Sequence, residues 1–282
     1  MNRILPRTLM LLLLMVMVSS CASNSPGPTA KGGADSARPI RILNTNTPPL
    51  AGGNEVEHRK VAEPLTLEQL RKKYPSNFIF QGPSEPKRVA LTFDDVPDEL
   101  FTLQVLDALK KHGVRATFFV VGNRAEDHPE VVKRMVEDGH VLGNHSYSHV
   151  NFPKVSNDEF HEEVLMTQKA VDEVVGGYQM RYIRPPYGNI SDDQIKWLVS
   201  QKLKIVNWNV DSLDWKGIDA DEVEKNIMSQ VKPGSIILQH GAGGAGEDLS
   251  GTVQALPRII QKLQDQGYEF VTLPELIHDK EQ

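Results

Sequence analysis

Two adjacent carboxylates, Asp94 and Asp95, directly follow the short apolar run 89–93. Two like charges side by side stay ionised together only when a cation or an arginine compensates them. The pair therefore predicts a site that holds positive charge. The alternative is an ordinary turn in which one aspartate caps a helix.

Two histidines, His145 and His149, stand four positions apart. Residues at this spacing lie on the same side of a helical turn, so both imidazoles could reach one ion. With Asp95 they form a set of two imidazoles and one carboxylate, which suits a divalent metal with open positions for water and substrate. Two satisfied surface histidines are the alternative.

Arg184 precedes Pro185 and Pro186, which fix the backbone just past a predicted strand. A guanidinium at such a rigid position could orient a carboxylate through a bidentate pair. A plain salt bridge would also explain the arginine.

The last two clusters are Asp211-Ser212-Leu213-Asp214-Trp215 and Leu238-Gln239-His240. An indole beside a carboxylate offers a flat apolar wall and an acceptor, although a core tryptophan near a solvated aspartate is the alternative. His240 ends an apolar run, which favours a position in a site. The glycine-rich run 241–246 lacks the Gly-Lys-Ser/Thr ending of a phosphate loop, so nucleotide binding is not expected.

These clusters fall where predicted strands end, within an alternating pattern of strands and helices. The strands are predicted over 89–93, 116–121, 182–183, 203–207, 235–239 and 270–272, and the helices over 100–112, 129–138, 155–175, 191–201, 220–230 and 253–266. Repeated βα units with buried strands imply a parallel sheet covered by helices. With about seven repeats the sheet could close into a barrel or stay open. In such folds chemistry collects at the strand ends.

In this order the clusters resemble the polysaccharide deacetylases with a NodB homology domain, carbohydrate esterase family 4. The resemblance covers about residues 88–277, and its motifs are Thr92-Phe93-Asp94-Asp95, His145-Ser146-x-x-His149, Arg184-x-Pro186-Tyr187, Asp211-x-x-Asp214-Trp215 and Leu238-x-His240. It implies a distorted (β/α) barrel with about seven parallel strands. The implied activity is metal-dependent removal of acetyl groups from N-acetylated sugars, with release of acetate.

The resemblance also implies which residues carry out the reaction. Asp95, His145 and His149 would bind a divalent metal, zinc first, with cobalt, nickel or manganese as alternatives. Asp94 would be the catalytic base. His240 would be the catalytic acid, which protonates the leaving amine.

Five further residues would support this machinery by the same resemblance. Arg184 would position the base, and Asp214 would tune the acid. Tyr187 would contribute its backbone N–H to the oxyanion. Trp215 and Leu238 would line the acetate pocket.

Two positions depart from the family pattern. Val96 stands where family members usually carry glycine, and Gly241 stands where they often carry aspartate. A Cβ at position 96 could change the loop beside the base, which puts the fit of the substrate in doubt more than the chemistry.

The N-terminus has the pattern of an export signal, with Arg3 and Arg7 before the apolar run 9–18 and small residues before Cys21. The run is too short to span a bilayer as a helix of about 20 residues. The string Val18-Ser19-Ser20-Cys21 resembles the bacterial lipobox, whose cysteine is lipidated. An ordinary secretory signal is the alternative. Since this is the only cysteine, any metal ligands in the mature domain must be His, Asp or Glu.

The predicted domains are a lipoprotein signal peptide over 1–21, a flexible tether and N-terminal extension over 22–85, and a deacetylase domain over 86–278. The composition is ordinary for a globular protein, and the formal charge of −6 without a basic run argues against nucleic acid as a partner. The expected partners are an N-acetylated polysaccharide and, through the lipid, the extracytoplasmic face of a bacterial membrane. The domain is expected to be a monomer.

Two other functions fit the same residues. An O-acetyl esterase acting on a xylan-type glycan would use the same site. A non-catalytic glycan-binding lipoprotein could keep the fold, although an intact base, acid and ligand set argues against it.

We expect Cys21→Ser to release the protein from the membrane fraction and to leave its activity unchanged, because the substitution removes the only thiol that could carry a lipid. Fractionation followed by mass spectrometry of the mature N-terminus is the measurement. An N-terminus without lipid in the wild type would refute the anchor.

Overall fold

The computed structural model describes residue 51 and residues 64–279. The predicted signal peptide and most of the predicted tether, with Cys21, therefore lie outside the described residues. Among the helices that the structure describes, none is long and apolar enough to cross a membrane.

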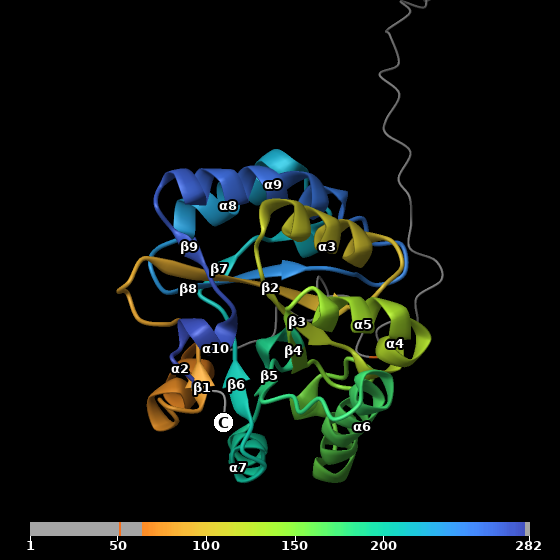
Figure 1. Cartoon of the computed structure of the whole chain (residues 1–282). Coiled ribbons are helices and arrows are strands. Elements are labelled where there is room, and N and C mark those ends of the chain that lie inside the picture. The colour runs from red at the N-terminus through yellow and green to blue at the C-terminus, as the bar shows by residue number, and fades with distance from the viewer. Residues whose placement is uncertain (1–50, 52–63, 280–282) are drawn as a thin grey trace, which may run out of the picture. The chain divides into compact units, whose positions relative to one another are not determined.

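The centre of the domain is a curled sheet of nine parallel strands, in the order β1-β6-β5-β4-β3-β2-β8-β7 with β9 beside β2 (Figure 1). The strands are β1 Phe78–Ile79, β2 Arg88–Val96, β3 Thr117–Val120, β4 Val141–Asn144, β5 Tyr182–Ile183, β6 Lys204–Val206, β7 Val210–Asp211, β8 Ser235–His240 and β9 Glu269–Phe270. This architecture confirms the predicted distorted (β/α) barrel. Sequence reasoning missed β1, β4 and β7, which have two, four and two residues. Strands this short show little periodicity.

Helices cover the outside of the sheet (Figure 1). They are α2 Pro64–Lys73, α3 Phe101–His112, α4 Gly122–Asp127, α5 Pro129–Glu137, α6 Asn157–Val175, α7 Asp192–Ser200, α8 Ala220–Gln230, α9 Ser250–Asp265 and α10 Leu273–Leu276, with 3-10 turns η2 Phe152–Lys154, η3 Pro186–Gly188 and η4 Asp214–Lys216. One core cluster joins β2, β3 and β8 to helices α3, α5, α8 and α9, and a second joins β1, β5 and β6 to α2, α6 and α7.

Local signals in the sequence set the ends of several helices. Gly113 ends α3 in the left-handed conformation, with a φ of 65°. The Ser156 side chain accepts a hydrogen bond from the backbone N–H of Glu159 at the start of α6. Ser191 and Gln194 form a reciprocal capping box on α7. These caps determine at which residues the helices between the strands begin and end.

Strand β2 is the longest strand and pairs with β3, β8 and β9, and its register with β8 brings two motifs together. Thr92 pairs with Leu238, and Asp94 pairs with His240, across the parallel ladder. Adjacent strands lie about 4.8 Å apart, so paired residues on one face are close neighbours. The register therefore places Asp94 and His240 side by side at the carboxyl end of the sheet.

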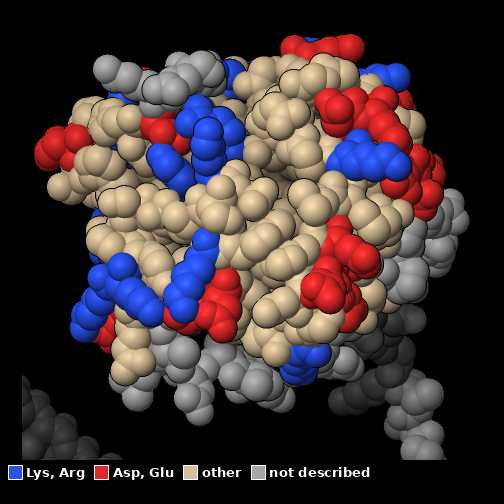
Figure 2. Space-filling view, turned by 90° about the horizontal axis from the view of Figure 1, so that it is seen from below, with Lys and Arg blue, Asp and Glu red and all other residues tan. Residues whose placement is uncertain are grey.

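One face of the domain carries charges of both signs. Figure 2 shows Lys and Arg side chains interspersed with Asp and Glu around a broad uncharged area. On that face the described residues form no continuous basic tract of the kind that binds nucleic acid.

Gln239 is a fully buried amide whose oxygen and nitrogen have no hydrogen-bond partner among the described residues. It pairs with Phe93, which belongs to the apolar core. A buried amide without a partner costs about 1–3 kcal/mol in proteins. We therefore expect Gln239→Met to raise the free energy of unfolding by about 1–2 kcal/mol, as measured by urea denaturation.

The matched control is Gln254→Met, which replaces an exposed glutamine on α9. We expect it to change the free energy of unfolding by less than about 0.5 kcal/mol. A loss of stability in Gln239→Met would mean that the amide is hydrogen-bonded in solution.

Candidate active site

Asp94 and Asp95 serve one site because the backbone turns between them. Adjacent side chains on an extended strand point to opposite faces. Here Asp95 adopts a left-handed φ of 66°, and the register between β2 and β3 shifts between Phe93 and Val96. The irregularity re-aims the second carboxylate, as β-bulges beside active sites do.

The two histidines lie on a loop, so the prediction of a helical turn was wrong. Residues 145–149 have no helical structure, and Ser146 and His149 have φ values of 64° and 61°. Gly143 and Asn144, directly before this loop, end strand β4. The Asn144 side-chain oxygen accepts a hydrogen bond from the Ser146 N–H at 2.9 Å. This contact favours a tight bend over a helix and still brings the imidazoles together.

Glu163 on α6 holds the far side of the same loop. Its carboxylate accepts hydrogen bonds from the backbone N–H groups of Tyr147 and Ser148, each at 2.8 Å, and from the Ser148 hydroxyl at 2.7 Å. Sequence reasoning missed this residue. A glutamate within a helix pattern, 14 positions beyond His149, carries no signal that separates it from its neighbours.

Asp95, His145 and His149 converge as the resemblance implied. One ligand atom from each lies within 4.8 Å of the others, and all three residues are buried. His145 Nε2 and His149 Nε2 lie 3.3 Å and 3.2 Å from Asp95 Oδ1. Neither carboxylate oxygen of Asp95 accepts a hydrogen bond from a described residue.

The hydrogen bonds of His145 fix its ring for binding a cation. Its Nδ1 lies 2.7 Å from the carbonyl oxygen of Arg184, and a carbonyl can only accept, so Nδ1 donates. In the neutral ring Nε2 then carries the lone pair and faces Asp95. Burial would lower the pKa of His145, but Asp94 and Asp95 raise it. When the ring is neutral, its Nε2 lone pair and the Asp95 carboxylate can both bind a divalent metal placed between them.

The charges in this cluster also suit a metal site. Burial lowers the pKa of His149 to about 3, although Asp95 opposes the shift. The ring is therefore neutral at pH 7 and able to bind a metal. Burial alone would raise the pKa of Asp95. At the low pH where this carboxyl would titrate, His149 and His145 carry positive charge, and their attraction holds the pKa of Asp95 below its ordinary value. The carboxylate is ionised.

Arg184 makes a buried ion pair with Asp94. Its Nη1 donates to Asp94 Oδ1 at 2.7 Å and to Thr92 Oγ1 at 2.8 Å. Its Nε donates to the Val206 carbonyl at 3.0 Å, and its Nη2 to the Asn207 carbonyl at 3.3 Å. The guanidinium is fully buried, so it compensates the charge of Asp94 without screening by water.

Asp214 holds His240 at two points. Its carboxylate accepts from His240 Nδ1 at 2.7 Å and from the His240 N–H at 2.8 Å. The Thr252 hydroxyl donates to the same carboxylate at 2.7 Å, a contact that sequence reasoning missed. Burial would raise the pKa of Asp214, but His240 and Thr252 together lower it. The imidazole is thus oriented by an ionised carboxylate.

The remaining predicted residues lie around this centre. Tyr187 has a φ of 61°, and its hydroxyl lies 3.1 Å from His149 Nδ1, a contact beyond the predicted role of its backbone. The half-buried Trp215 donates its indole N–H to Asp211 Oδ1 at 3.3 Å. Leu238 is fully buried, two positions before His240 on the same face of β8.

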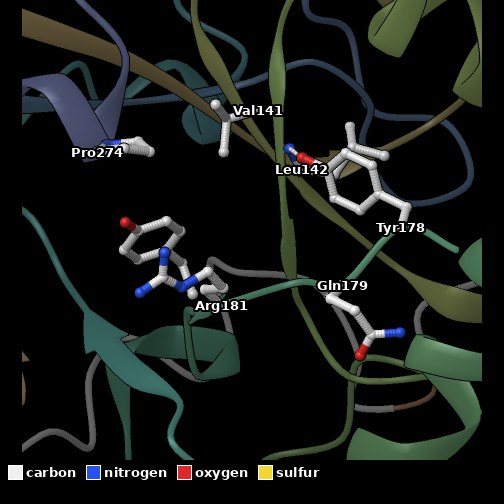
Figure 3. Close-up of a pocket in the computed structure, with 7 residues that line it drawn as sticks. Val141, Leu142, Tyr178, Gln179, Arg181 and Pro274 are labelled. Carbon is white, nitrogen blue, oxygen red and sulfur yellow. Dashed lines mark hydrogen bonds between the residues drawn. The ribbon is translucent and has the colours of Figure 1, made fainter. Parts of the chain in front are cut away.

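A separate hollow of about 340 Å³ opens at the amino ends of β4 and β5 (Figure 3). It is lined by Val141, Leu142, Tyr178, Gln179, Arg181, Tyr182 and Pro274. This lining contains no histidine and no carboxylate. The titratable groups that could do hydrolytic chemistry gather instead at the carboxyl ends of the strands.

Comparison with known proteins finds similarity to deacetylases of glycans. The model of the family described as polysaccharide deacetylase matches residues 81–206. A peptidoglycan-N-acetylglucosamine deacetylase of Bacillus cereus is 47% identical over 199 residues, which are 71% of each chain. A chitooligosaccharide deacetylase of Sinorhizobium fredii is 37% identical, over 66% of this chain and 90% of that protein. A Listeria monocytogenes peptidoglycan-N-acetylglucosamine deacetylase is 42% identical over 69% of this chain but only 40% of its own length.

Solved structures agree with these relatives. The peptidoglycan N-acetylglucosamine deacetylase Bc1960 superposes with a TM-score of 0.69 and 45% identity, over 72% of this chain and 94% of that one. The Bacillus anthracis protein BA3943, described as a pseudoenzyme of carbohydrate esterase family 4, gives a TM-score of 0.66 and 30% identity, over 71% of this chain and 68% of that one.

The two departures from the family pattern lie against each other. A Cβ built on Gly241 would lie 2.5 Å from Val96 Cγ1, far closer than two carbons can approach. We expect Gly241→Ala to lower the free energy of unfolding by about 1–3 kcal/mol, the usual cost of overpacking. In a Val96→Ala background the same change should cost less than about 1 kcal/mol.

Denaturant unfolding of the four proteins of this double-mutant cycle measures the coupling. The control pairs Gly241→Ala with Ile195→Val, which lies in the other core cluster and should be additive. Additive effects of Gly241→Ala and Val96→Ala would contradict the predicted contact.

Proposed function

Because the chain belongs to the polysaccharide deacetylase family, we propose that it hydrolyses N-acetyl groups of an N-acetylglucosamine-containing envelope polysaccharide and releases acetate. Peptidoglycan is the first candidate, since relatives from Bacillus cereus and Listeria monocytogenes carry that substrate in their names. Chitin-like oligomers are the second candidate, supported by the rhizobial relative.

One observation carries the proposal. Asp94 and His240 pair across β2 and β8, while Asp95, His145 and His149 converge beside Asp94. An amide needs an activated water and an acid for its poor leaving group. A base, an acid and a metal-binding set at one end of the sheet can meet both needs.

Asp95, His145 and His149 would hold a divalent metal, zinc first, with cobalt, nickel or manganese as alternatives. When bound, the metal supplies Lewis acidity and lowers the pKa of water towards about 7. Imidazole and carboxylate ligands suit zinc, and the three residues leave positions open for water and substrate.

Protein groups carry out the proton transfers and stabilise the oxyanion. Asp94, paired with Arg184, takes a proton from the attacking water. The backbone N–H of Tyr187 donates to the developing oxyanion. His240, oriented by Asp214, protonates the leaving amine. Trp215 and Leu238 contact the acetyl methyl.

We further propose that the protein acts as a monomer on the extracytoplasmic face of a bacterial membrane, anchored through Cys21. The pattern of residues 1–21 supports this location. An anchored enzyme would meet envelope glycans.

An O-acetyl esterase is the second candidate activity, since the same groups can hydrolyse an ester. A non-catalytic glycan-binding protein is the third candidate, and the relative described as a pseudoenzyme makes the test worthwhile. Acetate release from N-acetylglucosamine oligomers, peptidoglycan and acetylated xylan, each with and without chelator, separates all three. Release from xylan alone would favour the esterase, and release from none would favour the binding protein.

Substitutions of Asp94 and Asp95 should have different effects on metal binding and on rate. Asp94→Asn leaves the ligand set intact, so we expect it to keep the metal and lose about 10²–10⁴ in rate, the usual effect of removing a general base. Asp95→Asn should weaken metal binding, and excess metal should partly restore its activity. Metal analysis paired with acetate-release kinetics measures both effects.

The control is Asp193→Asn, an exposed aspartate that pairs with Lys196. It should keep both metal and rate. Metal loss in Asp94→Asn with retention in Asp95→Asn would reverse the two assignments.

A further inference from the structure

Arg124 is a fully buried arginine outside every motif of the site. It lies on the short helix α4, which follows β3 at the carboxyl edge of the sheet. Burying a guanidinium is costly unless charged and hydrogen-bonding partners compensate it. The contacts of Arg124 show which residues compensate its buried charge.

The guanidinium joins two strand ends through two different nitrogens. Its Nη1 donates to the backbone carbonyl of Asp95 at 2.6 Å. Its Nη2 donates to the backbone carbonyl of Gly243 at 2.7 Å, three residues beyond His240. One planar group therefore spans the metal-ligand turn of β2 and the loop that follows the acid on β8.

The contact with Asp95 falls on a strained peptide. Asp95 has a left-handed φ, which side-chain-bearing residues adopt only when their surroundings enforce it. That conformation turns the carboxylate towards the two histidines. A donor fixed on the Asp95 carbonyl favours this backbone conformation over the extended one.

Three carboxylates attract the Arg124 guanidinium electrostatically. Burial lowers the pKa of Arg124, and Asp95, Asp98 and Glu247 oppose that shift. Asp98 accepts hydrogen bonds from the N–H groups of Leu100 and Thr102. Glu247 accepts from the N–H of Gly244 in the loop after His240. The charge of Arg124 is thus compensated both from the segment after β2 and from the loop after β8.

We infer that Arg124 is a positioning residue that sets the distance between the metal-ligand turn at Asp95 and the loop behind the acid His240. The inference rests on the proposed function. This role requires the planar guanidinium of arginine, because the single ammonium group of lysine cannot donate to both carbonyls in the same geometry.

The test compares Arg124→Lys, which keeps the charge, and Arg124→Gln, which keeps one donor. The control is Arg134→Gln, an arginine on α5 that pairs with Asp107 and Asp138. For each full-length protein we measure zinc affinity by competition with a chromophoric chelator, metal-free unfolding in urea, and kcat and KM on N-acetylglucosamine oligomers.

We expect both Arg124 variants to fold, to bind zinc about 10–100-fold more weakly and to lose about 10–100-fold in kcat, since residues behind metal ligands have effects of this size. KM should change less than about threefold, because the substrate contacts remain. The control should match the wild type in all three measurements.

Several outcomes would overturn the inference. Wild-type zinc affinity and kcat in both folded variants would show that the fork positions nothing. Full function in Arg124→Lys alone would show that only charge is needed, and loss of folding in both variants would assign the arginine to the fold itself. If the wild type releases no acetate, the proposed function fails, and the zinc affinities still decide the role of Arg124.

Discussion

The ion pair between Arg184 and Asp94 is the interaction on which the site depends. It lies in the interior of the curled sheet, where removing one partner would leave an uncompensated buried charge. The guanidinium also lies 4.2 Å from the Phe119 ring and 5.5 Å from the Trp208 ring, measured to the centroids. Its own backbone carbonyl accepts from His145. A single residue thus holds the proposed base, orients a proposed metal ligand and fills the centre of the fold.

Around that centre the chain adopts unusual backbone conformations where chemistry is expected. Non-glycine residues with left-handed φ values gather there: Asp95, Ser146, His149, Tyr187 and Leu213. Such residues cost stability and persist only when neighbouring contacts enforce them. Glu163 and Asn144 supply those contacts for the histidine loop. The rigid strands therefore set the positions of the groups, and the strained loops set their directions.

The sequence predicted the class of fold well, because long helices and apolar strands have clear periods. The helix Ala220–Gln230 was predicted with its observed ends, and the side chains of Asp95, His145 and His149 lie together. The loop at His145 was mistaken for a helical turn, since a spacing of four fits both. Glu163, Thr252 and the hydroxyl of Tyr187 were missed, because contacts between segments far apart in the chain leave no local pattern.

The contact between Val96 and Gly241 also constrains the history of the sequence. A side chain at position 241 clashes with a valine at position 96, since its Cβ would lie 2.5 Å from Val96 Cγ1. A change from glycine at 96 and aspartate at 241 to the present pair avoids this clash only if the aspartate is lost before the valine is gained. Glycine at both positions is the permissive intermediate. The substitutions are epistatic, so restoring aspartate at position 241 while Val96 remains is the step that consensus-based engineering should avoid.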